Sequence, residues 1–492
     1  MKVSEWQVLG IIALYFIMLI VVSRITSRRA NNDSFFTGNH SSPWFIVAYG
    51  MIGASLSGVT FMSVPGYVQH SQFTYMGVIF GYVIGYVVIA LVLLPLYYKL
   101  KLTSIYTFLY QQFGTNSHKT GSFFFIISRL LGSALRMYLV VYVLYEFAFK
   151  NWGIPFELIA IAFIVLILGY TFKGGIKTII WTDTLQTTFM LLATVATIWY
   201  ILADMGISFG ELFENAAKSG YSTMIDSNWR SENFFLKQLL SGAFITIAMT
   251  GLDQDMMQKN LTCRSLRDAQ KNMFSLSISL VFVNFLFLSL GATLLYYAQQ
   301  TGFELPAKSD GIFPLIAFSL SSFTAIAFLV GLIAAGYSSA DGTLTALTTT
   351  FCYDFLRFDT TKKSEKEKTR LRKQIHICFA LLYLLVIIAF KPFHTDSLIK
   401  TIFDIAGYTY GPLLGLFSFG LIMKQYKPND HYIPYIAVAS PIICYIININ
   451  SVAWFNGYVF GFEMLILNGL LTFLGIWAIS KRTINNGITE IA

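Results

Sequence analysis

The stretch GLIAAGYSSADGTLTALTTTF, residues 331–351, decides how this sequence folds and what it can bind. It reaches the length of about 20 mainly apolar residues that a membrane-spanning helix needs, yet it contains serines, threonines and Asp341. Hydroxyl and carboxylate oxygens are hard ligands, which suit alkali cations better than soft metals. Ser338, Asp341 and Gly342 fall near one face at helical spacing. The stretch therefore favours a cation-binding span, with a polar seam between packed helices as the alternative.

The composition of the whole chain indicates a polytopic helical membrane protein. Of its 492 residues, 55% are hydrophobic and only 12% are charged, about half the charged share of a soluble domain. This excludes a soluble globular enzyme, a disordered protein and a disulfide scaffold. The four cysteines have no metal or CxxC spacing, so we expect free thiols. A net charge of +9 on a membrane protein points to bilayer orientation, and we expect no nucleic-acid partner.

Hydropathy predicts about thirteen transmembrane helices in a single domain covering residues 1–492. The first apolar run is expected to stay as a helix, because it lacks the flanks of a cleaved signal peptide. The long ninth stretch is expected to contain a short interfacial helix before the true span. The predicted spans are 6–23, 43–68, 75–98, 121–148, 153–172, 179–203, 235–257, 273–298, 313–352, 374–390, 396–423, 431–448 and 458–480.

The basic residues orient these spans, because cytoplasmic loops are enriched in Lys and Arg. With the N-terminus outside, the segments predicted to be cytoplasmic contain roughly three times as many basic residues as the outer segments. An odd number of spans then places the C-terminus in the cytoplasm. The outer loop at 204–234 has room for a short amphipathic helix. The compact loops suit a carrier of the plasma (inner) membrane of a bacterium.

The second span, YGMIGASLSGVTFMSVPG at residues 49–66, is weakened in its middle by glycines and serines. A broken helix at membrane depth is tolerated where it lines a cavity, and its free carbonyls can then coordinate a cation. Close helix packing through small residues is the equal alternative. In the eleventh span, Tyr408 and Tyr410 are candidates to close a gate, and Gly411 and Pro412 indicate a hinge.

Charged residues inside spans usually mark a pathway or a site. Arg129 and Arg136 lie two helical turns apart on one stripe. We expect Arg129 to pair internally or snorkel, whereas Arg136 either pairs internally or binds an anionic solute. We place Asp253, Asp255 and Glu463 near the interfaces. The full set expected at depth is Arg129, Arg136, Glu146, Asp183, Asp341 and Asp404.

Weakened spans, buried carboxylates and the lack of a covalent catalytic set describe an ion-coupled secondary transporter. An intramembrane enzyme is the rival from another class, but it would need a histidine or paired-carboxylate centre facing a lipid-accessible cavity. We therefore expect no enzymatic activity. A channel is disfavoured because no filter or repeated subunit is visible.

Four segments in order resemble the sodium:solute symporter family: GGIKTIIWTDTLQ (174–186), GLDQDMMQKNLTCRSLRDAQK (251–271), AAGYSSADGTLTALTT (334–349) and YTYGPLLGLFSFG (408–420). The resemblance covers most of the chain. It implies an all-α LeuT-type fold with two inverted five-helix repeats, at 43–203 and 235–423. The helices at 6–23, 431–448 and 458–480 would then be peripheral.

The resemblance also implies a coupling sodium, the one metal ion or cofactor expected, between the first and eighth core helices. Its ligands would be the carbonyls of Gly53, Leu56 and Ala335 and the hydroxyls of Ser338 and Ser339. Some members hold a second sodium one turn deeper. Here Asp183 matches that pattern, but Asp341 and Gly342 stand where hydroxyl residues would be. Asp183 and Asp341 could bind a second cation or share a proton.

The implied function is sodium-coupled import of a small organic solute by alternating access, with proton coupling in the same fold as the alternative. Because similar carriers of carboxylates can use an arginine of the third core helix, we favour an acidic sugar or other organic anion. A neutral sugar, a polyol or an amino acid is the alternative. The substrate-binding candidates are Ser55, Ser57, Thr60, Gln69, Tyr82, Tyr86, Arg136, Tyr138 and Thr246.

Overall fold

The computed structural model describes residues 4–28, 31–218, 220–393 and 398–482. The first part of the chain forms α1 (Glu5–Thr26), α2 (Asn32–Thr37), η1 (Gly38–His40), α3 (Trp44–Ser55), α4 (Gly58–Ser71), α5 (Met76–Val88), η2 (Ile89–Leu93), α6 (Leu94–Lys99), α7 (Thr107–Gln112), α8 (Thr115–Leu144), η3 (Tyr145–Phe149), η4 (Lys150–Trp152), α9 (Phe156–Met205) and α10 (Phe209–Lys218).

The second part forms α11 (Phe235–Thr246), η5 (Ile247–Gly251), α12 (Gln254–Leu261), α13 (Leu266–Thr301), η6 (Ser309–Gly311), α14 (Ile312–Leu320), α15 (Ser322–Thr350), η7 (Phe351–Phe355), α16 (Glu365–Ala389), η8 (Lys391–Phe393), α17 (Leu398–Ile422), η9 (Asp430–Tyr432), α18 (Ile433–Trp454) and α19 (Met464–Ala478). Two short strands, β1 (Tyr426–Pro428) and β2 (Ser480–Arg482), pair antiparallel.

Every predicted span has a helical counterpart. Within the described ranges, nine helices are long and apolar enough to cross a bilayer, and two bent pairs of helices raise that number to eleven. Two shorter apolar helices, Phe156–Phe172 and Met464–Ala478, fall on the two remaining predicted spans. The thirteenth span begins later than expected, because turns at 455–457 and 462–463 precede α19. The amphipathic helix expected in the loop at 204–234 is α10.

Two spans are broken at their centres. The first break separates α3 from α4, which are bent by 59° around Leu56 and Ser57. The second separates Phe235–Gly251 from α12, bent by 66° around Leu252 and Asp253. For the first break, the glycines and serines of the sequence left a broken helix and close helix packing as equal alternatives, and the structure shows the broken helix. The helix after the second break, α12, extends beyond residue 257, the predicted end of the span. It is polar but buried throughout, so it lies inside the protein.

A glycine makes the sharp junction inside α9, where the fifth and sixth predicted spans meet. Gly175 has φ of +52°, and a Cβ atom at this position would collide with Phe35 of α2. Only glycine adopts this backbone conformation without strain. The predicted interfacial helix is α14, and α15 begins directly after it with Ser321 as its N-cap.

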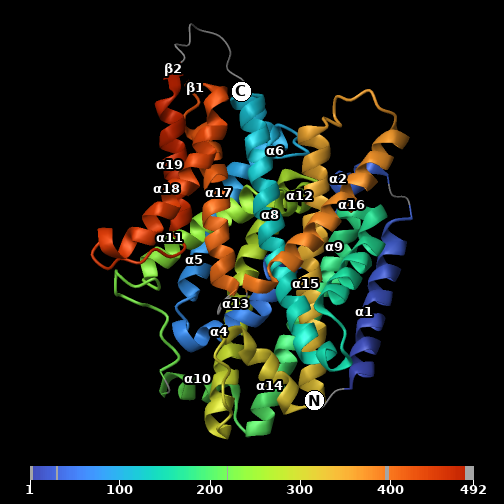
Figure 1. Cartoon of the computed structure of the whole chain (residues 1–492), viewed down its shortest axis with the longest axis vertical. Coiled ribbons are helices and arrows are strands. Elements are labelled where there is room, and N and C mark those ends of the chain that lie inside the picture. Colours follow the sequence, from blue (N-terminus) through green and yellow to red (C-terminus); the bar gives the residue numbers. More distant parts are fainter. Residues whose placement is uncertain (1–3, 29–30, 219, 394–397, 483–492) are drawn as a thin grey trace.

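The broken helices lie inside the bundle, against α9, α13 and α15. Figure 1 shows α1 on one side of the bundle and α18 and α19 on the other, with α8 and α15 between them. The β1–β2 pair lies at the opposite end from α10 and α14 (Figure 1). Outward-facing apolar side chains on the outer helices, such as Leu14 on α1 and Phe282 on α13, are about 70% exposed. Such a surface fits contact with lipid, and the protein is a multi-pass membrane protein.

Candidate sodium and solute sites

The break between α3 and α4 faces the centre of α15. Gly53 lies so close to α15 and α9 that a Cβ atom added to it would come within 3.4 Å of Ser338 Oγ and would collide with Thr187. The amide of Gly53 donates to Thr187 Oγ1 at 3.0 Å, which fixes the end of α3. Because α3 ends at Ser55, the carbonyls of its last turn lie outside the regular helical hydrogen-bond pattern. The structure thus brings the Gly53 end of the first broken helix against Ser338, one of the two predicted hydroxyl ligands.

Ser339 supports this assignment independently. Its side chain is 1% exposed, and its hydroxyl has no hydrogen-bond partner. A buried hydroxyl without a partner costs free energy, so its retention calls for an explanation. A dehydrated alkali cation bound by hard oxygen ligands would supply one. The residues present therefore fit a sodium ion held by Gly53, Leu56, Ala335, Ser338 and Ser339.

Asp183 lies next to these hydroxyls, as its place in the WTD motif suggested. Its Oδ1 atom accepts from Ser338 Oγ at 3.0 Å. Its Oδ2 atom lies 2.9 Å from Lys259 Nζ, and both side chains are 1% exposed. We did not predict a role for Lys259. The spacing of Asp255 and Lys259 at i, i+4 was the signal in the sequence that could have found it.

Asp253 and Asp255 correct a prediction, because they are fully buried rather than near an interface. Arg129 pairs with Asp255, and its Nη1 atom lies 3.6 Å from Asp253 Oδ2. Arg129 thus pairs internally with these two aspartates, the first of the two expectations for it. A charge buried in the membrane region needs such partners. We call Arg129, Lys259, Asp183, Asp253 and Asp255 the charge cluster.

Asp341 faces the same region from α15. Its Oδ2 atom accepts from Tyr170 OH at 2.9 Å, and its Oδ1 atom accepts from the amide of Gly342 at 2.6 Å. It is fully buried. A Cβ atom at Gly342 would lie 2.5 Å from Asp255 Oδ1, so a side chain there would have to displace the carboxylate of Asp255. Residues 341 and 342 therefore differ from the hydroxyl pattern, and the carboxylate of Asp255 occupies the space beside Gly342.

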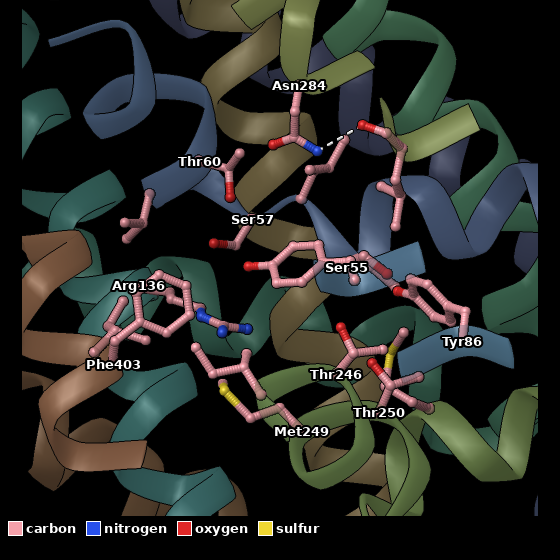
Figure 2. Close-up of a pocket in the computed structure, with 18 of the residues that line it drawn as sticks. Ser55, Ser57, Thr60, Tyr86, Arg136, Thr246, Met249, Thr250, Asn284 and Phe403 are labelled. Atoms are coloured by element: carbon pink, nitrogen blue, oxygen red, sulfur yellow. Dashed lines mark hydrogen bonds between the residues drawn. The ribbon is translucent and has the colours of Figure 1, made fainter. Parts of the chain in front are cut away.

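A cavity of about 80 Å³ lies beside the broken span and is shown in Figure 2. The guanidinium group of Arg136 points into it from one side, near Phe403, and Ser57 and Thr60 lie across from it (Figure 2). Tyr86, Thr246 and Thr250 occupy the other side (Figure 2). Of the predicted substrate residues, Ser55, Ser57, Thr60, Tyr82, Tyr86, Arg136 and Thr246 line this cavity. Sequence reasoning missed Tyr75, Thr250 and Asn284, which complete its polar lining.

Two predicted substrate residues do not line the cavity. Tyr138 stacks on Tyr142 at 5.9 Å between ring centroids and packs against Phe156. It lies two residues from Arg136, so the helix turns it about 200° away from the cavity face. Gln69 lies near the end of α4, three turns beyond the break. These two predictions are wrong for the conformation described here.

The gating candidates divide into two groups. Tyr410 donates to Asp253 Oδ2 at 2.6 Å and so joins α17 to the break before α12. Tyr408 instead faces the periphery, where its hydroxyl accepts from Asn448 on α18 at 2.8 Å. Gly411 and Pro412 pack where α17 meets α19. Asn468 Nδ2 donates to the carbonyls of Gly407 and Tyr408 there, both at 2.9 Å.

Two further carboxylates, Glu146 predicted inside a span and Glu463 predicted near an interface, also have basic partners. Glu146 pairs with Lys150 at 2.6 Å. Glu463 lies 3.4 Å from Lys237, which also lies over the ring of Tyr458. In the part of the chain that the structure describes, no three His, Cys, Asp or Glu side chains are arranged so that together they could hold a metal ion.

Known proteins share this architecture. A sialic acid symporter of solved structure, described as Na⁺-coupled and in a substrate-bound outward-open state, superposes with a TM-score of 0.80, 22% identity, and coverage of 96% of this chain and 99% of that one. The fold is therefore of the predicted LeuT type. The sodium/sialic acid symporter SiaT of Proteus mirabilis (strain HI4320) is 26% identical over 83% of both chains. The sodium/sialic acid symporter NanT of Aliivibrio fischeri (strain ATCC 700601 / ES114) is 23% identical over 96% of this chain and 94% of its own.

The sequence model of the sodium:solute symporter family matches residues 35–429, about four-fifths of the chain. The match contains the broken span, the hydroxyl pair of α15, the WTD aspartate and both arginines of α8. The resemblance that the four motifs indicated is confirmed: this chain belongs to the sodium:solute symporter family.

Proposed function

We propose that this protein imports an acidic sugar together with sodium by alternating access, and that it has no enzymatic activity. The observation that carries the choice of solute is the unpaired state of Arg136. Among the described residues, no carboxylate lies within ion-pair distance of it, and its Nε atom is buried without a hydrogen-bond partner.

An arginine inside a membrane protein needs an anionic partner. Arg129, on the same stripe of α8, has two aspartates, so Arg136 is the arginine left for a ligand. A carboxylate is a matching partner, because the planar guanidinium group can bind it through two parallel hydrogen bonds. The serine, threonine and tyrosine hydroxyls around the cavity can then bind the hydroxyl groups of a sugar.

The cavity is smaller than the roughly 300–1,000 Å³ of most small-molecule sites. A sugar would therefore widen it, and movement of α17 beside Arg136 and Phe403 is the simplest way to do so. The two bacterial relatives described above are named as sodium/sialic acid symporters. Sialic acids are carboxylated sugars, so these names support an acidic sugar as the solute class.

Sodium would bind at Gly53, Leu56, Ala335, Ser338 and Ser339, next to the cavity. The carbonyls of Gly53 and Leu56 come from the broken span, whereas the carbonyl of Ala335 and both hydroxyls come from α15. Bound sodium would therefore fix the break that also positions Ser55 and Ser57 for the solute. Each tenfold sodium gradient then supplies about 1.4 kcal/mol, enough for a tenfold solute gradient with one sodium per solute.

The proposed topology follows from the basic residues. The N-terminus lies outside and the C-terminus in the cytoplasm, in the plasma (inner) membrane. The repeats at 43–203 and 235–423 each begin with a broken span, which supports their inverted relationship. Helices α1, α18 and α19 would then lie outside the transport core.

Proton coupling in the same fold is the competing function. Asp341 favours it, because a carboxylate in place of a hydroxyl could carry a proton. Uptake that persists without sodium and collapses with the pH gradient would support that alternative.

The experiment is thermal unfolding of the purified protein with a panel of solutes, with sodium and with sodium replaced by choline. The panel contains sialic acid, other acidic sugars, neutral sugars, polyols, amino acids and simple carboxylates. A ligand that binds only the folded state stabilises it by RT ln(1 + [L]/Kd). We expect acidic sugars to stabilise the protein in sodium alone, and Arg136→Gln to remove that effect while keeping the effect of sodium.

The matched control is Arg230→Gln, which removes an exposed arginine that lies over Trp229 in the outer loop. It should respond as the unmodified protein does. Stabilisation by neutral solutes that survives Arg136→Gln would overturn the choice of solute. A protein that responds to no solute and not to sodium would overturn the proposed function as a whole.

A further inference from the structure

The charge cluster contains a positively charged lysine, Lys259, beside Asp183, the carboxylate that could bind a second sodium ion. Lys259 is carried by α12, the polar helix that follows the second broken span. Its Nζ atom lies 2.9 Å from Asp183 Oδ2 and 3.5 Å from Asp255 Oδ1. The side chain is 1% exposed, so water contributes little to its solvation. Its positive charge is therefore balanced by these two carboxylates.

Both oxygens of Asp183 are engaged by groups of the protein. Lys259 faces Oδ2, and the hydroxyl of Ser338 donates to Oδ1 at 3.0 Å. Asp341 is engaged in the same way, by Tyr170 at one oxygen and by the Gly342 amide at the other. A second cation at Asp183 Oδ2 would share that oxygen with the ammonium group of Lys259, and the repulsion between the two positive charges opposes its binding.

The carboxylate of Asp255, which lies beside Gly342, helps to hold Lys259 in place. The carboxylate of Asp255 lies where a side chain on residue 342 would point, so a hydroxyl residue there would have to displace it. Asp255 pairs with Arg129 and also faces Lys259. The absence of a side chain at Gly342 thus admits the carboxylate that helps to hold Lys259 against Asp183.

We propose that Lys259 is a tethered cation, which fills the position beside Asp183 that a second coupling sodium would take, so that the carrier moves one sodium per solute. The proposal rests on the function proposed above, in which sodium binds at Ser338 and Ser339. A lysine ammonium group is a compact point charge like a bound sodium. Because it is covalently attached, it stays with the protein and adds nothing to the ion gradient that drives uptake.

The proposal has an electrical consequence. One sodium and one solute anion carry no net charge, so uptake of sialic acid would not depend on the membrane potential. Two sodium ions per anion would carry one net charge. A potential of −100 mV would then raise the accumulation about 50-fold.

The first test counts sodium ions with sodium alone as the probe. The purified full-length protein is unfolded thermally over a sodium series at constant ionic strength. At saturation, the stability gained per tenfold rise in sodium is proportional to the number of bound ions. We expect a slope for one ion in the unmodified protein and in Lys259→Arg. Lys259→Gln removes the positive charge beside Asp183 and Asp255, so a second sodium ion can bind there. We therefore expect the slope of this variant to double.

The matched control is the double variant Lys259→Gln/Asp183→Asn, which removes one charge of each sign and should return the slope to that of one ion. The second test measures sialic acid accumulation in proteoliposomes with and without an imposed potential of −100 mV. We expect no change for the unmodified protein and a rise for Lys259→Gln.

The outcomes separate this proposal from the function on which it rests. Two sodium ions in the unmodified protein would overturn the tethered cation and leave sodium-coupled transport intact. A slope of zero in the unmodified protein would instead overturn sodium coupling itself. If Lys259→Gln does not fold, the ion count of the unmodified protein and of Lys259→Arg still decides the matter.

Discussion

Tyr410 donates a hydrogen bond to Asp253, with 2.6 Å between the phenolic oxygen and Oδ2. Tyr410 belongs to α17, whereas Asp253 is the N-cap of α12 directly after the second break. Both side chains are buried, and Arg129 lies 3.6 Å from the same carboxylate oxygen. The contact joins three elements on the side of the cavity that we predict to face the cytoplasm. It is therefore the strongest candidate for a closed inner gate.

Replacing Tyr410 by phenylalanine should loosen this gate. A hydrogen bond to a charged group contributes about 1.5–3 kcal/mol, so its loss should favour opening about tenfold or more. The measurement is the labelling rate of an Ala406→Cys variant by a thiol reagent added from the cytoplasmic side, with the four native cysteines replaced by serine. Ala406 lies in α17 one turn before Tyr410 and is 4% exposed.

Tyr408→Phe is the matched control, because that hydroxyl contacts Asn448 at the periphery instead of the gate. It should leave the labelling rate unchanged. Equal acceleration by both variants would show that a general loosening of α17, and not the contact with Asp253, controls access.

Asn468 should stabilise the proline-containing segment of α17. Pro412 has no N–H group, so the carbonyl of Tyr408 lacks its helical donor, and Asn468 Nδ2 donates to it at 2.9 Å. Asn468→Leu would leave this carbonyl without that donor and should lower the free energy of unfolding by about 1–3 kcal/mol. Thermal unfolding in detergent measures the change. Asn450→Leu is the control, since Asn450 is exposed and donates within its own helix. A destabilisation of similar size in both variants would contradict this explanation.

Gly53→Ala should weaken sodium binding. The added Cβ atom would collide with Thr187 and come within 3.4 Å of Ser338 Oγ, so the end of α3 must move away from α15. We expect the half-saturating sodium concentration to rise about tenfold or more, in line with a loss of about 1.4 kcal/mol. Sodium titration of the thermal unfolding temperature measures it.

The control for that experiment is Gly132→Ala on α8, where an added Cβ atom meets no other atom within 4 Å. This variant should keep its sodium affinity, because the added methyl group displaces no neighbouring atom. It should also keep its fold, because alanine is a better helix former than glycine. Unchanged sodium affinity in Gly53→Ala would remove the α3–α15 contact from the sodium site.

The sequence predicted the fold well where hydropathy was decisive. The thirteen spans and the interfacial helix α14 follow from local composition, which left the first break as one of two equal alternatives. The second break and α12 could not be predicted in the same way. The helix α12 and its N-cap are polar because they contain Asp253, Asp255 and Lys259. A polar segment at the end of a span is typical of the membrane–water interface. Only the tertiary fold shows that their charges satisfy one another inside the protein.

The residues of the candidate solute site could also be predicted only in part from the sequence. Arg136 and the hydroxyls of the broken span line one cavity because helix spacing places them on facing surfaces. Tyr138 and Gln69 were assigned from their helices alone, without regard to which face or depth they occupy. Asn284 was missed because a single asparagine in an apolar span gives no periodic signal. Its amide donates to the carbonyl of Leu280 at 2.7 Å, and the side chain lines the cavity.

The measurement that tests the central claim most directly is sodium-driven uptake of sialic acid into proteoliposomes by the unmodified protein and by Ser339→Ala. The control is Ser319→Ala, an exposed serine whose hydroxyl bonds within its own helix. We predict uptake only with an inward sodium gradient, its loss or a strong rise in half-saturating sodium for Ser339→Ala, and no change for Ser319→Ala. Uptake that is equal without sodium, or that Ser339→Ala leaves unaltered, would contradict the account.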